Sequence, residues 1–196
     1  GKLAMCGICG IFNCNNQEPI DRNLIQRMTN VLKHRGPDDE GIYINAKCNI
    51  GLGVRRLKVI DLETGHQPIH NEDETIWIVF NGEIYNFRDL REELEKKGHR
   101  FYTKSDTETI IHLYEEYGRD CVQRLNGMFA FAIWDNREER LFLARDRIGI
   151  KPLFYTEHKE SLIFASEIKS ILENREISKE IDVQSLHSMM KLQYVP

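Results

Sequence analysis

Two pairs of short apolar segments in the second half of the chain most constrain its fold. "MFAFAIWD" and "RLFLARD" are separated by the polar turn "NREE", and "PLFYT" and "SLIFAS" are separated by "EHKE". Apolar runs of this length joined by short polar turns are typical of β-hairpins. The chain is therefore predicted to form two antiparallel hairpins after Gly127.

The preceding part of the chain mixes further strands with helices. Apolar residues recur at helical spacing over 21–34, 86–97 and 105–117, and a glycine follows each of these segments. "GIYINAKCNIGLGV" predicts two strands joined by a turn at 45–47, and "ETIWIVFNGEIYN" predicts a buried strand that runs into a glycine turn. Helices on each side of such strand groups indicate an α+β fold with sheets between helical layers.

The composition excludes several functional classes. With a net charge of −4 over 196 residues, the chain lacks the basic surface of a nucleic-acid-binding protein. Its longest apolar runs are too short to cross a bilayer, and its opening residues do not resemble a secretory leader. Five scattered cysteines do not form a disulfide framework. We expect a cytoplasmic protein with no nucleic-acid or membrane partner.

Cys6 is the most prominent candidate for chemistry, and two interpretations compete. Cys6, Cys9 and Cys14 lie close in sequence, but a structural zinc site needs a second pair of ligands that the sequence does not supply. Cys48 and Cys121 stand alone in apolar surroundings, which is typical of core residues. Alternatively, a cysteine at the N-terminus is a nucleophile whose own α-amine accepts the thiol proton.

Other candidates also have structural alternatives. Asn81 and Gly82 could donate hydrogen bonds to an oxyanion, but an Asn-Gly pair is also typical of a hairpin turn. Arg55 and Arg56 are adjacent cations, and either could bind a carboxylate. Asp106 stands where a helix N-cap would lie. "GLGVRR" lacks the third glycine of a dinucleotide-binding loop.

Nine motifs together resemble class II glutamine amidotransferase domains of the asparagine synthetase type. They span residues 5–172 in the family's order, and "RGPD" and "NGEIYN" are similar to the asparagine synthetase branch. The resemblance implies an N-terminal-nucleophile hydrolase fold, a four-layer αββα sandwich with two antiparallel sheets. The motifs are "MCGICGIF", "LKHRGPDDEG", "RRLKVIDL", "GHQPI", "FNGEIYNF", "SDTE", "GMFAFAIWD", "RDRIGIKPLFY" and "FASEIKSIL".

The resemblance also implies roles for individual residues in hydrolysis of L-glutamine to glutamate and ammonia. Cys6 matches the family's N-terminal nucleophile, and Asn81 with Gly82 matches its oxyanion hole. Arg56 matches the residue that binds the glutamine α-carboxylate, and Asp106 the residue that binds the α-ammonium. Further substrate contacts map to Leu57, Val59, Ile60 and Glu83.

Two other motifs are expected to be structural. Arg35 in "HRGPD" is predicted to anchor the segment near Cys6. The basic loop "RDRIGIK" is interpreted as packing and interface rather than as a phosphate site. The glutaminase domain itself is expected to need no metal or cofactor.

The domain boundaries complete the prediction. Residues 1–5 are expected to be an expression remnant plus an initiator methionine, residues 6–174 the glutaminase domain, and residues 175–196 a linker and the start of a synthetase domain. That synthetase domain is expected to use ATP and magnesium and to receive the ammonia for asparagine synthesis. Three alternatives stay open. The acceptor of the ammonia could be another carboxylate such as a sugar acid, the chain could be a non-catalytic binding module with this fold, and it could form a homodimer.

Overall fold

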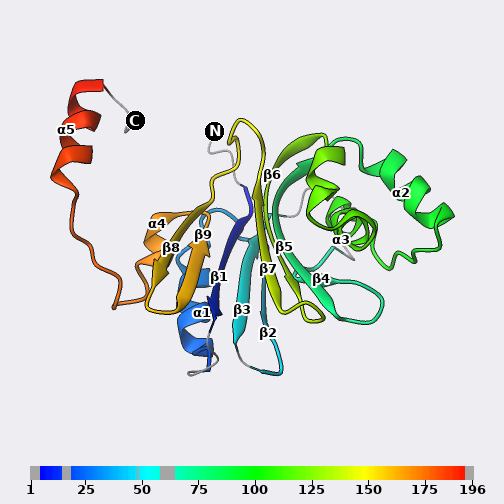
Figure 1. Ribbon diagram of the computed structural model, residues 1–196, viewed down its shortest axis with the longest axis horizontal. Coiled ribbons are helices and arrows are strands. Elements are labelled where there is room, and N and C mark those ends of the chain that lie inside the picture. Colours follow the sequence, from blue (N-terminus) through cyan, green and yellow to red (C-terminus); the bar gives the residue numbers. More distant parts are fainter. Residues whose placement is uncertain (1–4, 15–18, 48, 58–64, 193–196) are drawn as a thin grey trace.

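The chain folds as two β-sheets packed face to face and covered by helices on both outer sides (Figure 1). The structure is a computed structural model, which describes residues 5–14, 19–47, 49–57 and 65–192. Every pair of neighbouring strands in both sheets is antiparallel. The α+β layout expected from the hairpin and helix patterns is therefore confirmed.

The first sheet has five strands in the order β2-β3-β1-β9-β8. The N-terminal strand β1 lies at its centre, where Gly7 pairs with Arg55 of β3 and Cys9 pairs with Ala165 of β9. The opening residues of the chain are thus held between two strands that come from distant parts of the sequence. The bounds are β1 Gly7–Asn13, β2 Asp39–Ile44, β3 Ile50–Arg56, β8 Phe154–His158 and β9 Ser161–Ala165.

The second sheet has four strands in the order β4-β5-β6-β7. The two predicted hairpins form as expected, but β6–β7 belongs to this sheet and β8–β9 belongs to the first one. The longest contact joins β5 to β6 over nine residue pairs from Ile76–Asp135 to Ile84–Gly127. The bounds are β4 Ile69–His70, β5 Ile76–Ile84, β6 Gly127–Asp135 and β7 Arg140–Arg145.

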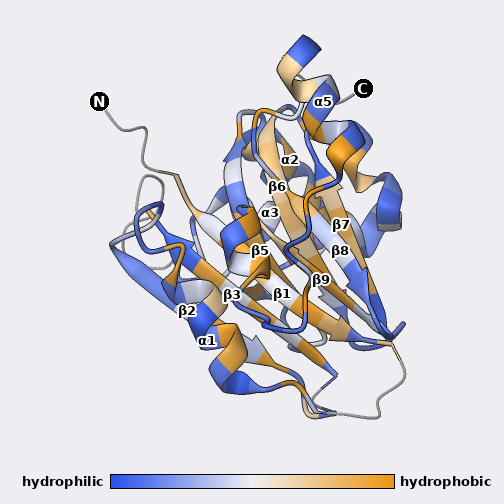
Figure 2. Cartoon of the chain, turned by 90° about the vertical axis from the view of Figure 1, so that its left-hand side faces the viewer, coloured by the Kyte–Doolittle hydropathy of each residue, from blue (hydrophilic) through white to orange (hydrophobic). Residues whose placement is uncertain are grey.

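The helices divide between the two outer faces. Helices α1 and α4 contact the first sheet, and α3 contacts the second sheet with α2 packed beside it. The predicted helices all form, with slightly shorter bounds, and Figure 2 shows hydrophobic and hydrophilic residues alternating along α1. The bounds are α1 Arg22–Asn30, α2 Phe87–Lys96, α3 Asp106–Tyr117, the 3-10 helix η1 Gly118–Arg124 and α4 Ile168–Ile171.

Three apolar layers hold the sandwich together. The middle layer joins residues of both sheets, including Ile8, Leu52 and Val54 from the first and Val79 and Trp134 from the second. The outer layers join the second sheet to α2 and α3 and the first sheet to α1 and α4. Because side chains of a strand alternate between its faces, each strand contributes to the middle layer with every second residue.

The expected turn at Asn81 and Gly82 is wrong, because both residues lie inside strand β5. Gly82 pairs with Phe129, and a Cβ at this position would come within 2.2 Å of the carbonyl oxygen of Met128. A carbon and an oxygen atom that are not bonded to each other cannot come this close. The glycine is therefore required by the close approach of β6 rather than by turn geometry.

The last described helix, α5 (Val183–Leu192), lies apart from the two sheets (Figure 1). Its apolar residues Val183, Leu186, Met189 and Met190 are all exposed. Among the described residues, no helix combines the length and the apolar content that crossing a bilayer requires.

Replacing Trp134 tests whether the middle layer carries the stability of the sandwich. Trp134 is buried against Phe12 of the opposite sheet, so Trp134→Ala leaves a large cavity and should lower the free energy of unfolding by about 3–5 kcal/mol. Trp77 is partly exposed and stacks on Tyr43, so Trp77→Ala should cost less than half as much. Urea unfolding of both variants measures the difference. Equal losses would contradict this account of the core.

Candidate active site

The two-residue repeat of three strands brings Cys6, Arg56 and Asn81 to one end of the space between the sheets. Cys6 lies two residues before Ile8, Arg56 two after Val54, and Asn81 two after Val79, and these three apolar residues all belong to the middle layer. Alternation places each polar residue on the same inner face as its apolar neighbour. The apolar layer thus ends in a group of polar side chains.

These side chains line a pocket of about 290 Å³. Of the nine site residues predicted from the sequence, seven lie in its wall. Val59 and Ile60 lie outside the described residues. The lining residues are Met5, Cys6, Arg56, Leu57, Gln67, Phe80, Asn81, Gly82, Glu83, Ser105, Asp106, Thr107, Met128, Ile150 and Lys151.

The Cys6 thiol lies against the chain at the end of β3. The backbone N–H of Leu57 donates a hydrogen bond to Cys6 Sγ at 3.4 Å, and Sγ lies 3.8 Å from the Leu57 carbonyl oxygen. Burial raises the pKa of the Cys6 thiol, although the Leu57 N–H and the charges of Arg56 and Lys151 act in the opposite direction. A base is therefore needed to make this thiol a nucleophile near neutral pH.

The structure distinguishes the two adjacent arginines. Arg55 points to the outer side of the sheet, where it pairs with Glu40 at 2.5 Å and donates to Asn30 Oδ1 at 2.7 Å. Arg56 is buried on the inner face and lines the pocket. Arg55 is thus a structural residue, and Arg56 is the one placed to meet a ligand.

Asn81 and Gly82 offer two hydrogen-bond donors to the pocket. Asn81 Nδ2 is buried and has no hydrogen-bond partner among the residues that the structure describes. The N–H groups of Phe80 and Ile84 point away from β6, because they donate to Gln67 Oε1 and Asp106 Oδ2. Gly82 lies midway between them, so the strand repeat directs its N–H to the same side. A buried donor without a partner is costly unless a ligand meets it.

Asp106 is the first residue of α3 rather than its N-cap. The cap is Ser105, whose side chain accepts the N–H of Thr107, so the alternative that Asp106 serves only as a cap is wrong. The Asp106 carboxylate instead accepts the N–H of Ile84 at 2.9 Å and lines the pocket. Burial raises the pKa of Asp106 to about 6, against the effect of that hydrogen bond.

Arg35 anchors Cys6, as the sequence predicted. Its Nε donates to the carbonyl oxygen of Cys6 at 3.0 Å, and its Nη1 pairs with Glu167 at 2.9 Å. Burial raises the pKa of Glu167, but hydrogen bonds from Arg35, His34 and Lys169 outweigh it and hold this pKa at about 2. The ion pair fixes the backbone on which the thiol is mounted.

Lys151 is a pocket residue that the sequence analysis missed. The loop before it folds around Asp146, whose carboxylate accepts the N–H groups of Ile150 and Lys151, while Arg145 donates to the Lys151 carbonyl oxygen. This agrees with the structural role expected for the basic loop. The Lys151 side chain is nevertheless buried in the pocket wall, with Nζ 3.1 Å from Met5 Sδ. Burial, together with the charge of Arg35, lowers its pKa.

The structure does not support a cysteine metal site. Cys9 is buried on the outer side of β1 against Thr29, on the opposite face from Cys6. The described cysteines are all free, and none of them joins a group of neighbouring metal ligands. Cys121 is buried, as predicted, whereas Cys48 lies outside the described residues.

Comparison with known proteins identifies the family of this chain. Residues 5–196 match the family described as a glutamine amidotransferase domain. The chain belongs to this family.

The amidotransferase domain is similar to asparagine synthetases. It is 46% identical to glutamine-hydrolyzing asparagine synthetase 1 of Bacillus subtilis, over 98% of this chain and 30% of that protein. It is 43% identical to glutamine-hydrolyzing asparagine synthetase 3 of Arabidopsis thaliana, over 88% of this chain and 29% of that protein. The amidotransferase domain therefore spans about a third of the length of these relatives.

The fold is also that of a known amidotransferase. The structure superimposes on glutamine phosphoribosylpyrophosphate amidotransferase from Bacillus subtilis with a TM-score of 0.67 at 22% identity, covering 85% of this chain and 43% of that one. This likeness confirms the N-terminal-nucleophile hydrolase sandwich that the sequence motifs implied.

The charge of Lys151 is expected to promote ionisation of the Cys6 thiol. Lys151→Met should slow alkylation of Cys6 by iodoacetamide at pH 8 by about threefold or more, because loss of the cation raises the thiol pKa and leaves less thiolate. Lys159→Met is the matched control, because Lys159 is exposed and pairs with Glu176. Peptide mass spectrometry separates Cys6 from the exposed Cys14. An unchanged rate at Cys6 would remove Lys151 from this role.

Proposed function

We propose that this domain hydrolyses L-glutamine to glutamate and ammonia through a thioester on Cys6. The observation that carries the proposal is the convergence of a thiol, two hydrogen-bond donors, the buried cations Arg56 and Lys151 and the buried carboxylate of Asp106 in a single pocket. A free amino acid with a side-chain amide presents complementary groups. Its amide supplies a carbonyl carbon and a developing oxyanion, and its α-carbon carries a carboxylate and an ammonium. The likeness to glutamine-hydrolyzing synthetases supports the same substrate.

The proposed reaction begins with proton transfer. When Cys6 is the first residue, its α-amine has an ordinary pKa of about 7.7–8.0 and accepts the thiol proton directly or through one water. The thiolate attacks the amide carbon of glutamine, and the oxyanion that forms accepts hydrogen bonds from Asn81 Nδ2 and the Gly82 N–H. The amine returns the proton to the leaving nitrogen, which departs as ammonia. Water then hydrolyses the thioester and releases glutamate.

Charged side chains bind the α-carboxylate and the α-ammonium of the substrate. Arg56 suits the α-carboxylate because a guanidinium and a carboxylate can form two parallel hydrogen bonds. Asp106 suits the α-ammonium when its carboxylate is ionised. Together these contacts favour free glutamine over a glutaminyl residue in a peptide, where both charges are lost. Leu57, Glu83, Val59 and Ile60 are proposed as further substrate contacts.

The proposal extends to the longer protein of which such a domain is a part. The ammonia is passed to a synthetase domain whose start lies within residues 175–196. That domain uses ATP and magnesium and amidates aspartate in the cytoplasm. The length and the names of the similar proteins support this arrangement. The hydrolysis step itself needs no metal or cofactor, because the thiol, the amine and the two donors supply the chemistry.

The N-terminal amine is the decisive test. In the sequence given, Cys6 is joined to Met5 by a peptide bond, and Met5 lies in the pocket. A form that begins at Cys6 should release glutamate from glutamine about 10²–10⁴ times faster than the chain with residues 1–5 attached, since the general base is lost in the latter. Cys6→Ala in the shorter form should abolish turnover and retain the melting temperature.

Two results would decide against this mechanism. Equal turnover in both forms would show that the α-amine is not the base. Glutamine binding without turnover in the shorter form would favour a binding module with this fold.

Glutamine binding should weaken at low pH, because Asp106 has a pKa of about 6 in the folded protein. Below that pH the carboxyl is neutral and loses its attraction for the ammonium, so the Kd should rise about tenfold per pH unit in the Cys6→Ala background. Asp106→Asn should bind weakly at every pH. Asp89→Asn is the matched control, since Asp89 lies in the first turn of α2. Calorimetric titration that gives Asp106→Asn an unchanged Kd would refute the assignment.

A further inference from the structure

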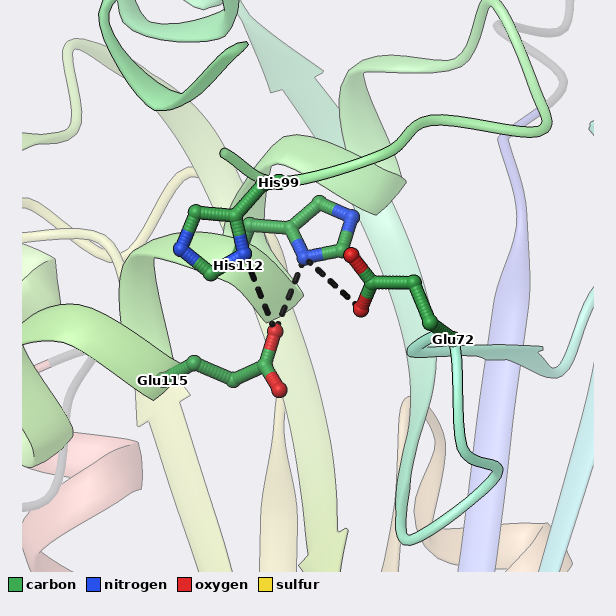
Figure 3. A group of neighbouring side chains, drawn as sticks. All are labelled: Glu72, His99, His112 and Glu115. Carbon is green, nitrogen blue, oxygen red and sulfur yellow. Dashed lines mark hydrogen bonds and ion pairs between the residues drawn. The ribbon is translucent and has the colours of Figure 1, made fainter. Parts of the chain in front are cut away.

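A second group of functional side chains lies outside the pocket. His99, His112, Glu72 and Glu115 point toward one another from three separate segments (Figure 3). Each offers one nitrogen or oxygen atom, and these four atoms all lie within 4.8 Å of one another. None of these residues lines the pocket that contains Cys6.

The distances between these atoms suit a tetrahedral metal ion. His112 Nδ1 lies 2.8 Å from Glu115 Oε2 and 3.8 Å from Glu72 Oε2, and His99 Nδ1 lies 3.5 Å from Glu115 Oε2. Zinc binds nitrogen and oxygen ligands at about 2.0–2.2 Å, which places tetrahedral ligands about 3.4 Å apart. The observed separations bracket that value.

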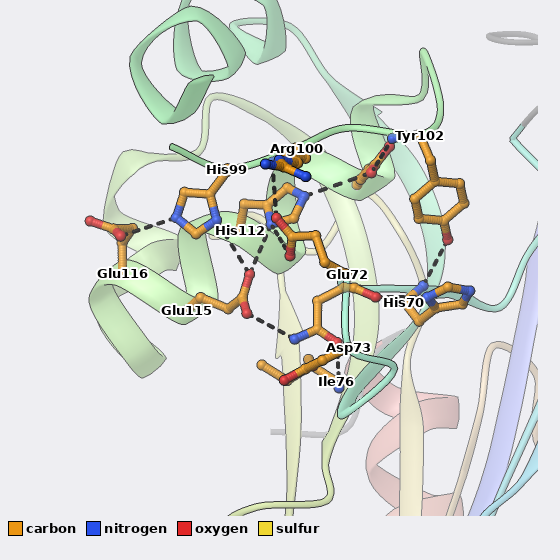
Figure 4. Close-up of polar contacts among 12 residues, drawn as sticks. His70, Glu72, Asp73, Ile76, His99, Arg100, Tyr102, His112, Glu115 and Glu116 are labelled. Atoms are coloured by element: carbon orange, nitrogen blue, oxygen red, sulfur yellow. Dashed lines mark hydrogen bonds and ion pairs between the residues drawn. The ribbon is translucent and has the colours of Figure 1, made fainter. Parts of the chain in front are cut away.

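A carboxylate lies behind the ring of each histidine, on the side away from the other ligands (Figure 4). His99 Nε2 bonds Glu116 Oε1 at 3.0 Å, and His112 Nε2 lies 3.7 Å from Glu108 Oε1. Histidine ligands of metals usually have a carboxylate or carbonyl behind them, which fixes the tautomer and the orientation of the ring.

The two carboxylate ligands are oriented in the same way. Glu115 Oε1 accepts the side-chain N–H of Asn71 at 2.8 Å, and Glu72 Oε1 accepts the backbone N–H of Arg100 at 2.9 Å. In both residues the outer contact leaves Oε2 directed at the histidines. The group therefore has both an inner set of ligand atoms and an outer set of supports.

The local sequence places His99 at this point. Helix α2 ends at Lys96, and Gly98 beyond it has φ of +102°, a value that side-chain-bearing residues rarely adopt. The N–H of His99 then closes the helix by donating to the carbonyl oxygen of Leu94 at 3.1 Å. The chain turns here toward α3, whose residues His112 and Glu115 share one face at a spacing of three.

The charge of the group also favours a cation. Four carboxylates, those of Glu72, Glu108, Glu115 and Glu116, surround the two imidazoles. The surroundings thus stabilise positive charge at the centre of the group, which a metal ion supplies with defined geometry.

We propose that His99, His112, Glu72 and Glu115 form a structural binding site for a divalent transition-metal ion, zinc in the first place. Two imidazole nitrogens with two carboxylate oxygens suit zinc and disfavour magnesium and calcium, which prefer oxygen ligands. The ion ties the β4–β5 turn and the segment after α2 to helix α3. It takes no part in the chemistry at Cys6.

Zinc binding by the whole chain tests the proposal. With the protein freed of metal, titration with zinc chloride should show one ion bound per chain. At free zinc about 100 times the Kd, the melting temperature should rise by about 5–10 °C. Magnesium chloride at the same concentration should produce no comparable shift.

Variants locate the bound ion. Glu72→Gln and His99→Gln change ligands that are not fully buried, and each should raise the zinc Kd at least about tenfold. Glu74→Gln in the same turn and His66→Gln, an exposed histidine paired with Asp39, are the matched controls and should keep the Kd of the unmodified chain. The loss of affinity in Glu72→Gln and His99→Gln also separates the site from zinc bound by free thiols, because these two changes leave the thiols intact.

Three outcomes would overturn the site. The first is the absence of stoichiometric zinc binding. The second is binding that persists unchanged in Glu72→Gln and His99→Gln, which would place the ion elsewhere. The third is an equal loss of affinity in the ligand variants and in the two controls, which would show that the effect is not specific to this group.

Discussion

The packing of two antiparallel sheets against each other is the interaction on which the rest of the molecule depends. Ile8, Leu52 and Val79 belong to an apolar layer that neither sheet could bury alone. Because strands alternate with a period of two, the same repeat that fills this layer also directs Cys6, Arg56 and Asn81 to one end of it. The pocket is thus a continuation of the core in which polar side chains replace apolar ones, and its precision follows from the rigidity of the sheets.

Burial in this pocket disfavours the charged forms of its acidic groups. It raises the pKa of both Cys6 and Asp106, since a low-polarity environment disfavours negative charge. The cations Arg56 and Lys151 act in the opposite direction at Cys6. A buried thiol with a raised pKa needs a base beside it, and an α-amine on the same residue is a base that requires no additional side chain. This explains how the proposed reaction proceeds in a pocket whose described wall contains no histidine.

Helix α3 connects the pocket to the proposed metal site. Its first residue, Asp106, lines the pocket, while His112 and Glu115 lie two to three turns further along and meet His99 and Glu72. The helix is buried along most of its length, including charged residues such as Glu108, whose carboxylate accepts the N–H groups of Tyr102 and Thr103. Such a helix is positioned by polar contacts as well as by apolar packing. A bound ion would strengthen this positioning without contacting the substrate.

The sequence by itself determined the hairpins, the helices and the motif order that implies the fold, because periodicity and turn residues are local signals. It also identified Cys6, Arg56, Asn81, Gly82 and Asp106 through the resemblance of motifs. Only the tertiary structure decided that Arg55 faces α1, that Gly82 is required by the carbonyl of Met128, and that Lys151 enters the pocket. It alone brought His99 to Glu72. These outcomes depend on which strands pair and which faces meet. Such contacts join residues that are far apart along the chain, so no periodic pattern in the sequence reveals them.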